Sequence, residues 1–145
     1  MFVKISPRRI ALSLSSVAFV LCGAEFPAQA ANADLVVRDL SIDPNPVKFA
    51  HELVIRFNVV NHGPSQAPAS RARWTISGNP GMTFYCSVPA LAVNQAHKCD
   101  WMWLMTPNKT GTYGTWAEVD VDRAVPEGAA GEANNRTKLD LKVVK

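Results

Sequence analysis

Oxygen-bearing side chains are concentrated near the end of the chain, in the stretch EVDVDRAVPEGAAGEANN. Paired carboxylates can act as acid and base when a cleft separates their pKa values, and clustered oxygens can also bind calcium. The spacing lacks the DxDxDG pattern of a helix-bounded calcium loop, and the intervening Gly, Ala and Pro predict a flexible loop. We therefore expect a turn between strands, with a calcium site as the alternative interpretation of Asp120, Asp122, Glu127 and Glu132.

The two amides that follow have a structural role in this interpretation. Asn134 and Asn135 tolerate left-handed backbone and can hydrogen-bond local N–H groups. They would set the register of a final strand at 137–144, so that its odd-numbered side chains face the core. No cofactor is expected under this interpretation.

Sulfur chemistry is the second possibility. Cys86 and Cys99 remain once an N-terminal leader is removed, and an even pair in an exported chain predicts a disulfide. Its short loop would stabilise the fold by about 3 kcal/mol in the chain-entropy model. A metal pair is the alternative, but there is no CxxC motif, and His97 is the single histidine nearby.

Aromatic residues flank both cysteines. If the two segments form a hairpin with the cysteines opposite one another, the side chains on that face also pair, Phe84 with Trp101 and Met82 with Trp103. This alternation favours a buried cluster around the disulfide. The competing interpretation is a sugar-binding platform formed by Tyr85, Trp101 and Trp103.

Alternating apolar and polar residues predict the elements that hold these groups. In 53–61 the odd-numbered residues are apolar, and in 72–76 Trp74 and its even-numbered neighbours are. The expected strands are 35–42, 53–61, 72–76, 82–88, 97–105, 112–121 and 137–144. Short strands separated by turns predict an all-β fold, a single antiparallel sandwich of about seven strands.

The N-terminus has the order of a secretory signal peptide. Three basic residues precede the apolar run IALSLSSVAFVL, and Ala28-Gln29-Ala30 follows as a cleavage site. Leu21 before Cys22 disfavours lipid attachment. We expect a signal peptide at 1–30 and one domain at 31–145, periplasmic or secreted, with no further segment long enough to span a membrane.

Charge excludes one class of partner. Removing the leader's three basic residues and one acidic residue from totals of 15 and 12 leaves a net charge of +1. A nearly neutral domain has no electrostatic footprint for nucleic acid, so we expect no nucleic-acid partner.

Five short motifs, in order along the chain, resemble a known family. They are Asp34-Leu35-Val36-Val37, Asn61-His62-Gly63, Pro89-Ala90-Leu91, Gly111-Thr112-Tyr113 and the final loop with Asp120, Val125, Glu127 and Glu132-Ala133-Asn134-Asn135. From Ala33 to Val144 the chain resembles the CARDB domain, the cell-adhesion-related domain found in bacteria. Two features differ: the step from Glu127 to Glu132 is two residues longer than the family pattern, and the cysteine pair with its Trp-rich hairpin is not a hallmark of the family.

The resemblance implies an immunoglobulin-like β-sandwich and a non-catalytic role in binding or adhesion. Motifs of common enzymes are absent: there is no Gly-x-Ser-x-Gly, HExxH or nucleotide loop, and the three histidines are scattered. We therefore expect no enzyme activity, and an unknown protein or cell-surface carbohydrate as partner. The alternatives are a carbohydrate-binding accessory module with exposed tryptophans, and a periplasmic subunit or chaperone that pairs strand edges with its partner.

Overall fold

A computed structural model describes residues 32–78, 82–103, 107 and 109–145. The predicted signal peptide therefore lies outside the described residues, as do the end of the expected strand 97–105 and most of the expected turn at 78–81. No helix among the described residues is long and apolar enough to cross a membrane.

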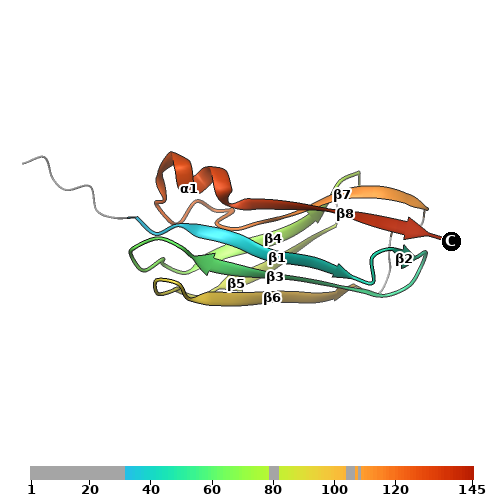
Figure 1. Cartoon of the computed structure of the whole chain (residues 1–145), viewed down its shortest axis with the longest axis horizontal. Coiled ribbons are helices and arrows are strands. Elements are labelled where there is room, and N and C mark those ends of the chain that lie inside the picture. Colours follow the sequence, from blue (N-terminus) through green and yellow to red (C-terminus); the bar gives the residue numbers. More distant parts are fainter. Residues whose placement is uncertain (1–31, 79–81, 104–106, 108) are drawn as a thin grey trace, which may run out of the picture.

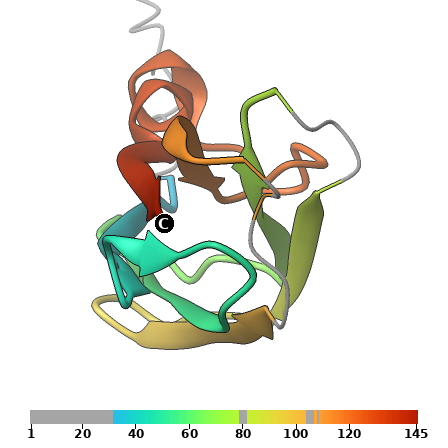
Figure 2. The same cartoon turned by 90° about the vertical axis from the view of Figure 1, so that its right-hand side faces the viewer.

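Two sheets pack face to face (Figures 1 and 2), and all their strand pairs are antiparallel except the short parallel pair of β2 with β8. The first has the strand order β1-β3-β6, and the second has the order β2-β8-β7-β4-β5. In chain order the strands are β1 (Leu35–Asp43), β2 (Val47–Lys48), β3 (Leu53–Asn61), β4 (Ser70–Ile76), β5 (Thr83–Val88), β6 (Ala96–Trp103), β7 (Gly111–Glu118) and β8 (Arg136–Val144). The expected immunoglobulin-like sandwich is confirmed, with seven strands close to their predicted positions and a two-residue strand, β2, in addition.

The core lies between the sheets and follows the alternation in the sequence. In β3 the odd-numbered residues are buried, and in β4 Ala72, Trp74 and Ile76 are buried while Arg73 and Thr75 are partly exposed. Trp74 is fully buried, and its ring lies 5.9 Å from that of Phe84 and 6.0 Å from that of Trp103. Burial of these side chains is the main force that holds the two sheets together.

A short helix, α1 (Gly128–Asn134), lies at the end of the sandwich where β1 begins (Figure 1). The sequence predicted a flexible loop here, and that prediction is wrong. The segment turns with Gly128 at a positive φ of 75° and then continues through helix-favouring alanines. Gly131 lets the helix pack closely, because a Cβ at this position would lie 2.6 Å from Cβ of Glu127.

Candidate functional site

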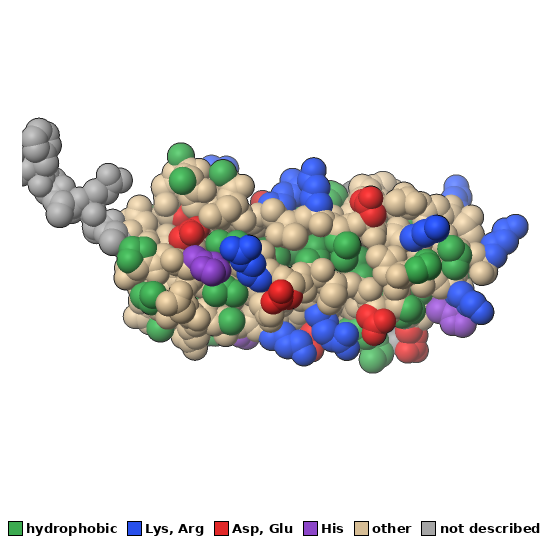
Figure 3. All heavy atoms as spheres, viewed as in Figure 1, with side chains coloured by type: hydrophobic (Ala, Val, Ile, Leu, Met, Phe, Trp, Pro, Cys, Tyr) green, Lys and Arg blue, Asp and Glu red, His purple; other side chains and the backbone are tan. Residues whose placement is uncertain are grey.

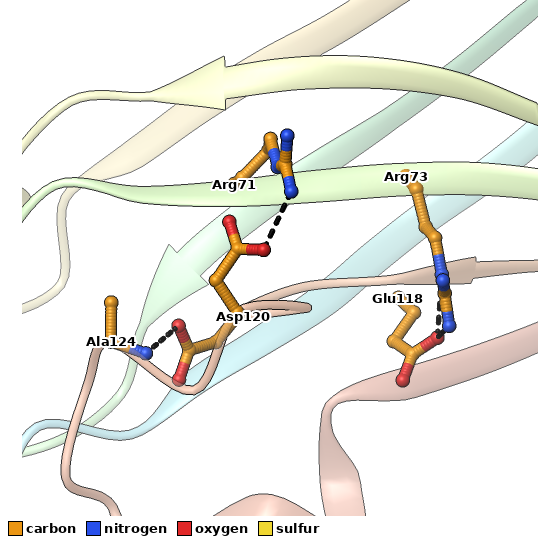
Figure 4. A network of polar contacts seen from close by, with 6 residues as sticks. Arg71, Arg73, Glu118, Asp120 and Ala124 are labelled. Carbon is orange, nitrogen blue, oxygen red and sulfur yellow. Dashed lines mark hydrogen bonds and ion pairs between the residues drawn. The ribbon is translucent and has the colours of Figure 1, made fainter.

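Asp120 lies directly after β7 and is buried, in contrast to the solvated loop that the sequence suggested. One carboxylate oxygen accepts the backbone N–H of Ala124 at 2.8 Å (Figure 4), and the other accepts that of Val125 at 3.0 Å. Its backbone has a positive φ of 52°, a conformation that Asp tolerates better than most residues. Both oxygens therefore hold the turn between β7 and α1.

Glu127 stands at the start of α1 and is also buried. Its Oε1 accepts the backbone N–H of Leu35 at 2.6 Å, and its Oε2 accepts Nδ2 of Asn135 at 2.7 Å. Burial raises the pKa of this carboxyl above its ordinary value of 4.5, while the two hydrogen bonds act in the opposite direction. The side chain connects the start of β1, the helix and the start of β8.

Asp122 and Glu132, the other two candidate metal ligands, are exposed. Asp122 pairs with Arg71 on β4 at 2.6 Å. Asp120 and Asp122 thus face different neighbours although they are two residues apart, and the structure does not bring the four carboxylates together around one point with free oxygens.

The asparagine pair stands at the junction between α1 and β8. Asn135 closes the helix with right-handed backbone, so the expectation of left-handed asparagines is wrong. Nδ2 of Asn134 donates to Oδ1 of Asp34 at 3.0 Å, and Asn135 is bound to Glu127 as described. The amide of Asn134 therefore connects distant segments, whereas that of Asn135 binds the residue at the other end of α1.

The other motifs that carried the resemblance are also structural. Asn61 is fully buried; its Oδ1 accepts the N–H groups of Asp34 and Gly63, and its Nδ2 donates to the carbonyl oxygens of Ser65 and Leu91. It thereby joins three of the five motifs. A Cβ at Gly63 would lie 2.4 Å from the backbone nitrogen of Asp34, so the close approach requires glycine.

Tyr113, near the start of β7, belongs to a fourth of the five motifs and also has a structural role. Its hydroxyl donates to the carbonyl oxygen of Lys109 at 2.9 Å, four residues upstream. This arrangement is similar to the tyrosine corner of immunoglobulin-like sandwiches, which fixes the connection into the strand.

Cys86 and Cys99 form a disulfide with a Cα–Cα distance of 6.0 Å. The expected hairpin is wrong, however, because β5 pairs with β4 and β6 pairs with β3. The disulfide therefore joins the edge strands of two different sheets. Phe84 and Trp101 still face one another, with ring centroids 6.2 Å apart, but they meet across the sandwich.

The three candidate ligand-contact aromatics are in different environments. Trp103 is buried, and Trp101 is partly buried against Phe57, whose ring centroid is 5.5 Å away. Tyr85 is 51% exposed on the outer face of the five-stranded sheet. The positions of Trp101 and Trp103 therefore agree with the core interpretation. Of the three candidate aromatics, Tyr85 is the one that lies at the surface.

The outer face of the five-stranded sheet carries features that the sequence analysis missed. The guanidinium of Arg71 lies 4.8 Å from the ring centroid of Tyr85, and that of Arg136 lies 4.3 Å from the ring centroid of Trp116. Between these pairs Arg73 binds Glu118 at 2.7 Å (Figure 4). Burial alternates along β7, with Thr115 and Ala117 inward, and this period of two could have placed Trp116 on the outer face.

Basic side chains outnumber acidic ones on this face. Lys and Arg side chains gather at the upper edge of the molecule in Figure 3, over β8. A groove of about 520 Å³ opens beside Arg71, and its lining includes Ser70, Ser87 and Asp122. On β4, β7, β8 and the turn after β7, the charged residues of this face are Arg71, Arg73, Arg136, Lys138 and Lys142, with Glu118, Asp122 and Asp140.

The family model described as CARDB matches residues 32–138. A crystal structure of a CARDB domain from Pyrococcus furiosus, in complex with di-metal ions, is 26% identical with a TM-score of 0.63, covering 78% of this chain and 90% of that chain. A solution NMR structure of the same domain is 26% identical with a TM-score of 0.62, covering 79% and 97%.

A more distant structure shares the fold alone. An alkylpurine DNA glycosylase from Pseudomonas fluorescens is 10% identical with a TM-score of 0.54, covering 78% of this chain and 31% of that chain. A comparison with curated proteins found no match.

Proposed function

Because the chain belongs to the CARDB family, we propose that it is an exported, non-catalytic binding module with a role in adhesion. The family supports a role related to adhesion. The charged and apolar pattern of residues 1–30 supports export to the periplasm or beyond. The binding surface that we propose is the outer face of the five-stranded sheet.

The stacked arginines on that face are the observation that carries this proposal. Arg, Tyr and Trp are enriched at protein interfaces, where a few such residues supply most of the binding energy. Stacking on Tyr85 and Trp116 restricts Arg71 and Arg136 before any partner arrives, which reduces the entropy lost on binding. The sheet beneath holds all four residues in fixed register.

Charge on this face selects the class of partner. Its five basic side chains against three acidic ones favour a protein with an acidic surface. The ion pair between Arg73 and Glu118 is partly buried within the face, whereas that between Arg71 and Asp122 is exposed and can exchange for a carboxylate of a partner. We therefore assign Arg71 and Arg136 to partner contact.

A polysaccharide is the second candidate, favoured by the groove beside Arg71. The hydroxyl and charged side chains that line this groove can hydrogen-bond to a sugar. Tyr85, which stacks on Arg71, provides an aromatic ring nearby. Neither Trp101 nor Trp103 contributes to this surface in our proposal, because both face the core.

We further propose that the acidic segment is a scaffold element in this chain and not a metal site. The Pyrococcus furiosus relative was solved with di-metal ions. In this chain the two buried carboxylates, Asp120 and Glu127, already accept four hydrogen bonds from nitrogen donors. Every one of these oxygens thus has a nitrogen donor that a cation would have to share or displace, which disfavours a metal site here.

Crosslinking to envelope proteins, followed by mass spectrometry, tests the binding face. We compare the native protein with the double variant Arg71→Glu and Arg136→Glu, and with a control of equal charge change, Arg38→Glu and Lys98→Glu, on the three-stranded sheet. We expect one protein to be captured by the native and control forms and lost with the arginine variant, with capture weakening as salt rises.

Two results would contradict this proposal. Equal capture by the arginine variant and the control would remove the outer face as the binding surface. Binding to purified cell-envelope polysaccharide, with quenching of fluorescence that is lost in Tyr85→Ala, would favour the sugar-binding candidate instead.

A further inference from the structure

The disulfide has a histidine beside it. His97 and Cys99 are two residues apart on β6, so both side chains face the other sheet, where Cys86 lies. A ring nitrogen of His97 and the two sulfur atoms all lie within 4.8 Å of one another. Among the described residues, the ring of His97 has no hydrogen-bond or ion-pair partner.

The three side chains differ in exposure in a way that suits a bound ion. Cys99 is 1% exposed, whereas Cys86 and His97 are partly exposed at the edge of the sandwich. An ion could therefore reach the cluster from solvent. A water molecule could then occupy a coordination position that the protein leaves open.

The cluster does not depend on the disulfide for its place in the fold. Six residues of β5 are in register with β4, and eight residues of β6 are in register with β3. The two strands share no backbone pairing with each other. Breaking the sulfur–sulfur bond therefore removes no strand pairing, and each thiol stays on its own sheet opposite the other.

We propose that Cys86, Cys99 and His97 form a binding site for a thiophilic d¹⁰ cation, Zn²⁺ or Cu⁺, when the disulfide is reduced. Two thiolates and one imidazole are a ligand set that these ions bind well. A tetrahedral zinc centre separates its sulfur ligands by roughly 3.8 Å. The Cα–Cα distance of 6.0 Å allows that separation by rotation of the side chains alone.

The reaction that opens the site requires a dithiol reductant. Its two thiols supply two electrons and two protons, the Cys86–Cys99 bond breaks, and the reductant becomes a disulfide. Each cysteine thiol then loses its proton as the cation binds, so binding releases two protons. With the disulfide intact neither Cys86 nor Cys99 has a thiolate, so the oxidised protein is the closed form of the site.

Cobalt(II) is the probe for this proposal. The purified protein is reduced, freed of reductant under anaerobic conditions, and titrated with Co²⁺ while thiolate-to-cobalt charge-transfer absorption is followed. We expect saturation at one Co²⁺ per chain, displacement of the band by Zn²⁺, and no band with the oxidised protein. A parallel titration with Cu⁺ against a chromophoric chelator distinguishes the two natural ions.

Single substitutions test the assigned ligands. Loss of one of three ligands in His97→Ala should weaken Co²⁺ binding by about 100-fold or more. The control His51→Ala removes an exposed histidine distant in sequence from the cluster and should have no effect. Near-ultraviolet circular dichroism of the reduced protein verifies that its tryptophans keep their packing.

Three results would overturn the proposal. The reduced protein could fail to give the charge-transfer band. His97→Ala could bind Co²⁺ as tightly as the native chain does. The near-ultraviolet spectrum could disappear on reduction, which would show that the strands do not hold the thiols in place without the disulfide.

Discussion

The carboxylate of Glu127 accepts the backbone N–H of Leu35 at 2.6 Å, although 92 residues separate the two in sequence. Leu35 begins β1 at an edge of the three-stranded sheet, while Glu127 is the N-cap of α1, which leads into β8 of the other sheet. The bond therefore closes the end of the sandwich. An N–H group buried there without a partner would cost about 1–3 kcal/mol.

Substitution of Glu127 by alanine should destabilise the fold by about 2–4 kcal/mol, because it leaves the N–H of Leu35 and the amide of Asn135 without acceptors. Glu127→Gln should cost less, since its carbonyl oxygen can still accept one of these two hydrogen bonds. Chemical denaturation of the three proteins measures the difference. Equal stability of Glu127→Ala and the native chain would contradict the closing role.

The free energy of unfolding should change with pH because the carboxyl of Glu127 titrates differently in the folded and unfolded chains. Burial raises the folded-state pKa of Glu127 above the ordinary value of 4.5. The unfolded chain therefore loses this proton at lower pH than the folded chain does. The contribution of Glu127 is full below the unfolded pKa and decreases as pH rises through the folded pKa.

Glu127→Gln cannot titrate at this position, so its stability is the reference for that of the native protein. The free energy of unfolding of the native protein, relative to that of Glu127→Gln, should fall as pH rises from about the unfolded-state value. Denaturation curves at several pH values measure it. A difference that stays constant over this range would show that the folded carboxyl titrates normally.

Asp120 and Asp122 form a matched pair for substitution by asparagine. Asp120→Asn replaces one acceptor by a donor facing a backbone N–H, and should cost about 1–3 kcal/mol. Asp122→Asn disrupts only an exposed ion pair with Arg71, and should cost less than about 1 kcal/mol. Thermal unfolding of both variants checks the order, and a larger loss for Asp122→Asn would reverse our assignment.

Calcium should leave the melting temperature unchanged, because the buried carboxylates already have nitrogen donors. A site with a millimolar constant would add about 1.4 kcal/mol at ten times that concentration, enough to raise the melting temperature by several degrees. Melting curves with calcium and with chelator measure the effect. A rise of that size that is abolished by Glu132→Gln would make the acidic segment a metal site.

Trp74→Ala should destabilise the protein by about 3–5 kcal/mol, since it empties a fully buried site between Phe84 and Trp103. Trp74→Phe should cost clearly less, because the indole N–H has no hydrogen-bond partner in the described chain and phenylalanine removes it. Urea denaturation compares the two. Similar losses would show that the N–H has a partner, such as water.

Local sequence patterns determined the strands and the side of each strand that faces inward. In β3 and β4 the alternation of apolar and polar residues is enough, because successive side chains in a strand point to opposite faces. The family motifs likewise indicated the immunoglobulin-like fold. None of these signals depends on which strands become neighbours, so all of them can be read along the chain.

The tertiary structure decided which distant groups meet. Cys86 and Cys99 are in strands that follow one another, yet those strands joined different sheets, so the disulfide spans the sandwich instead of a hairpin. Alternation gives the face of a strand but not its partner. The partner depends on how the whole chain buries its apolar surface and satisfies its backbone N–H groups.

The acidic segment shows the same limit most clearly. Its composition of Gly, Ala and carboxylates is compatible with a solvated loop, and nothing local places Leu35 or Asp34 beside it. Once β1 and β8 lie next to the helix, Glu127 accepts the N–H of Leu35 and Asn134 donates to Asp34, both from the other end of the chain. Burial of Glu127 and of the N–H of Leu35 makes their hydrogen bond necessary, and that burial exists only in the folded molecule.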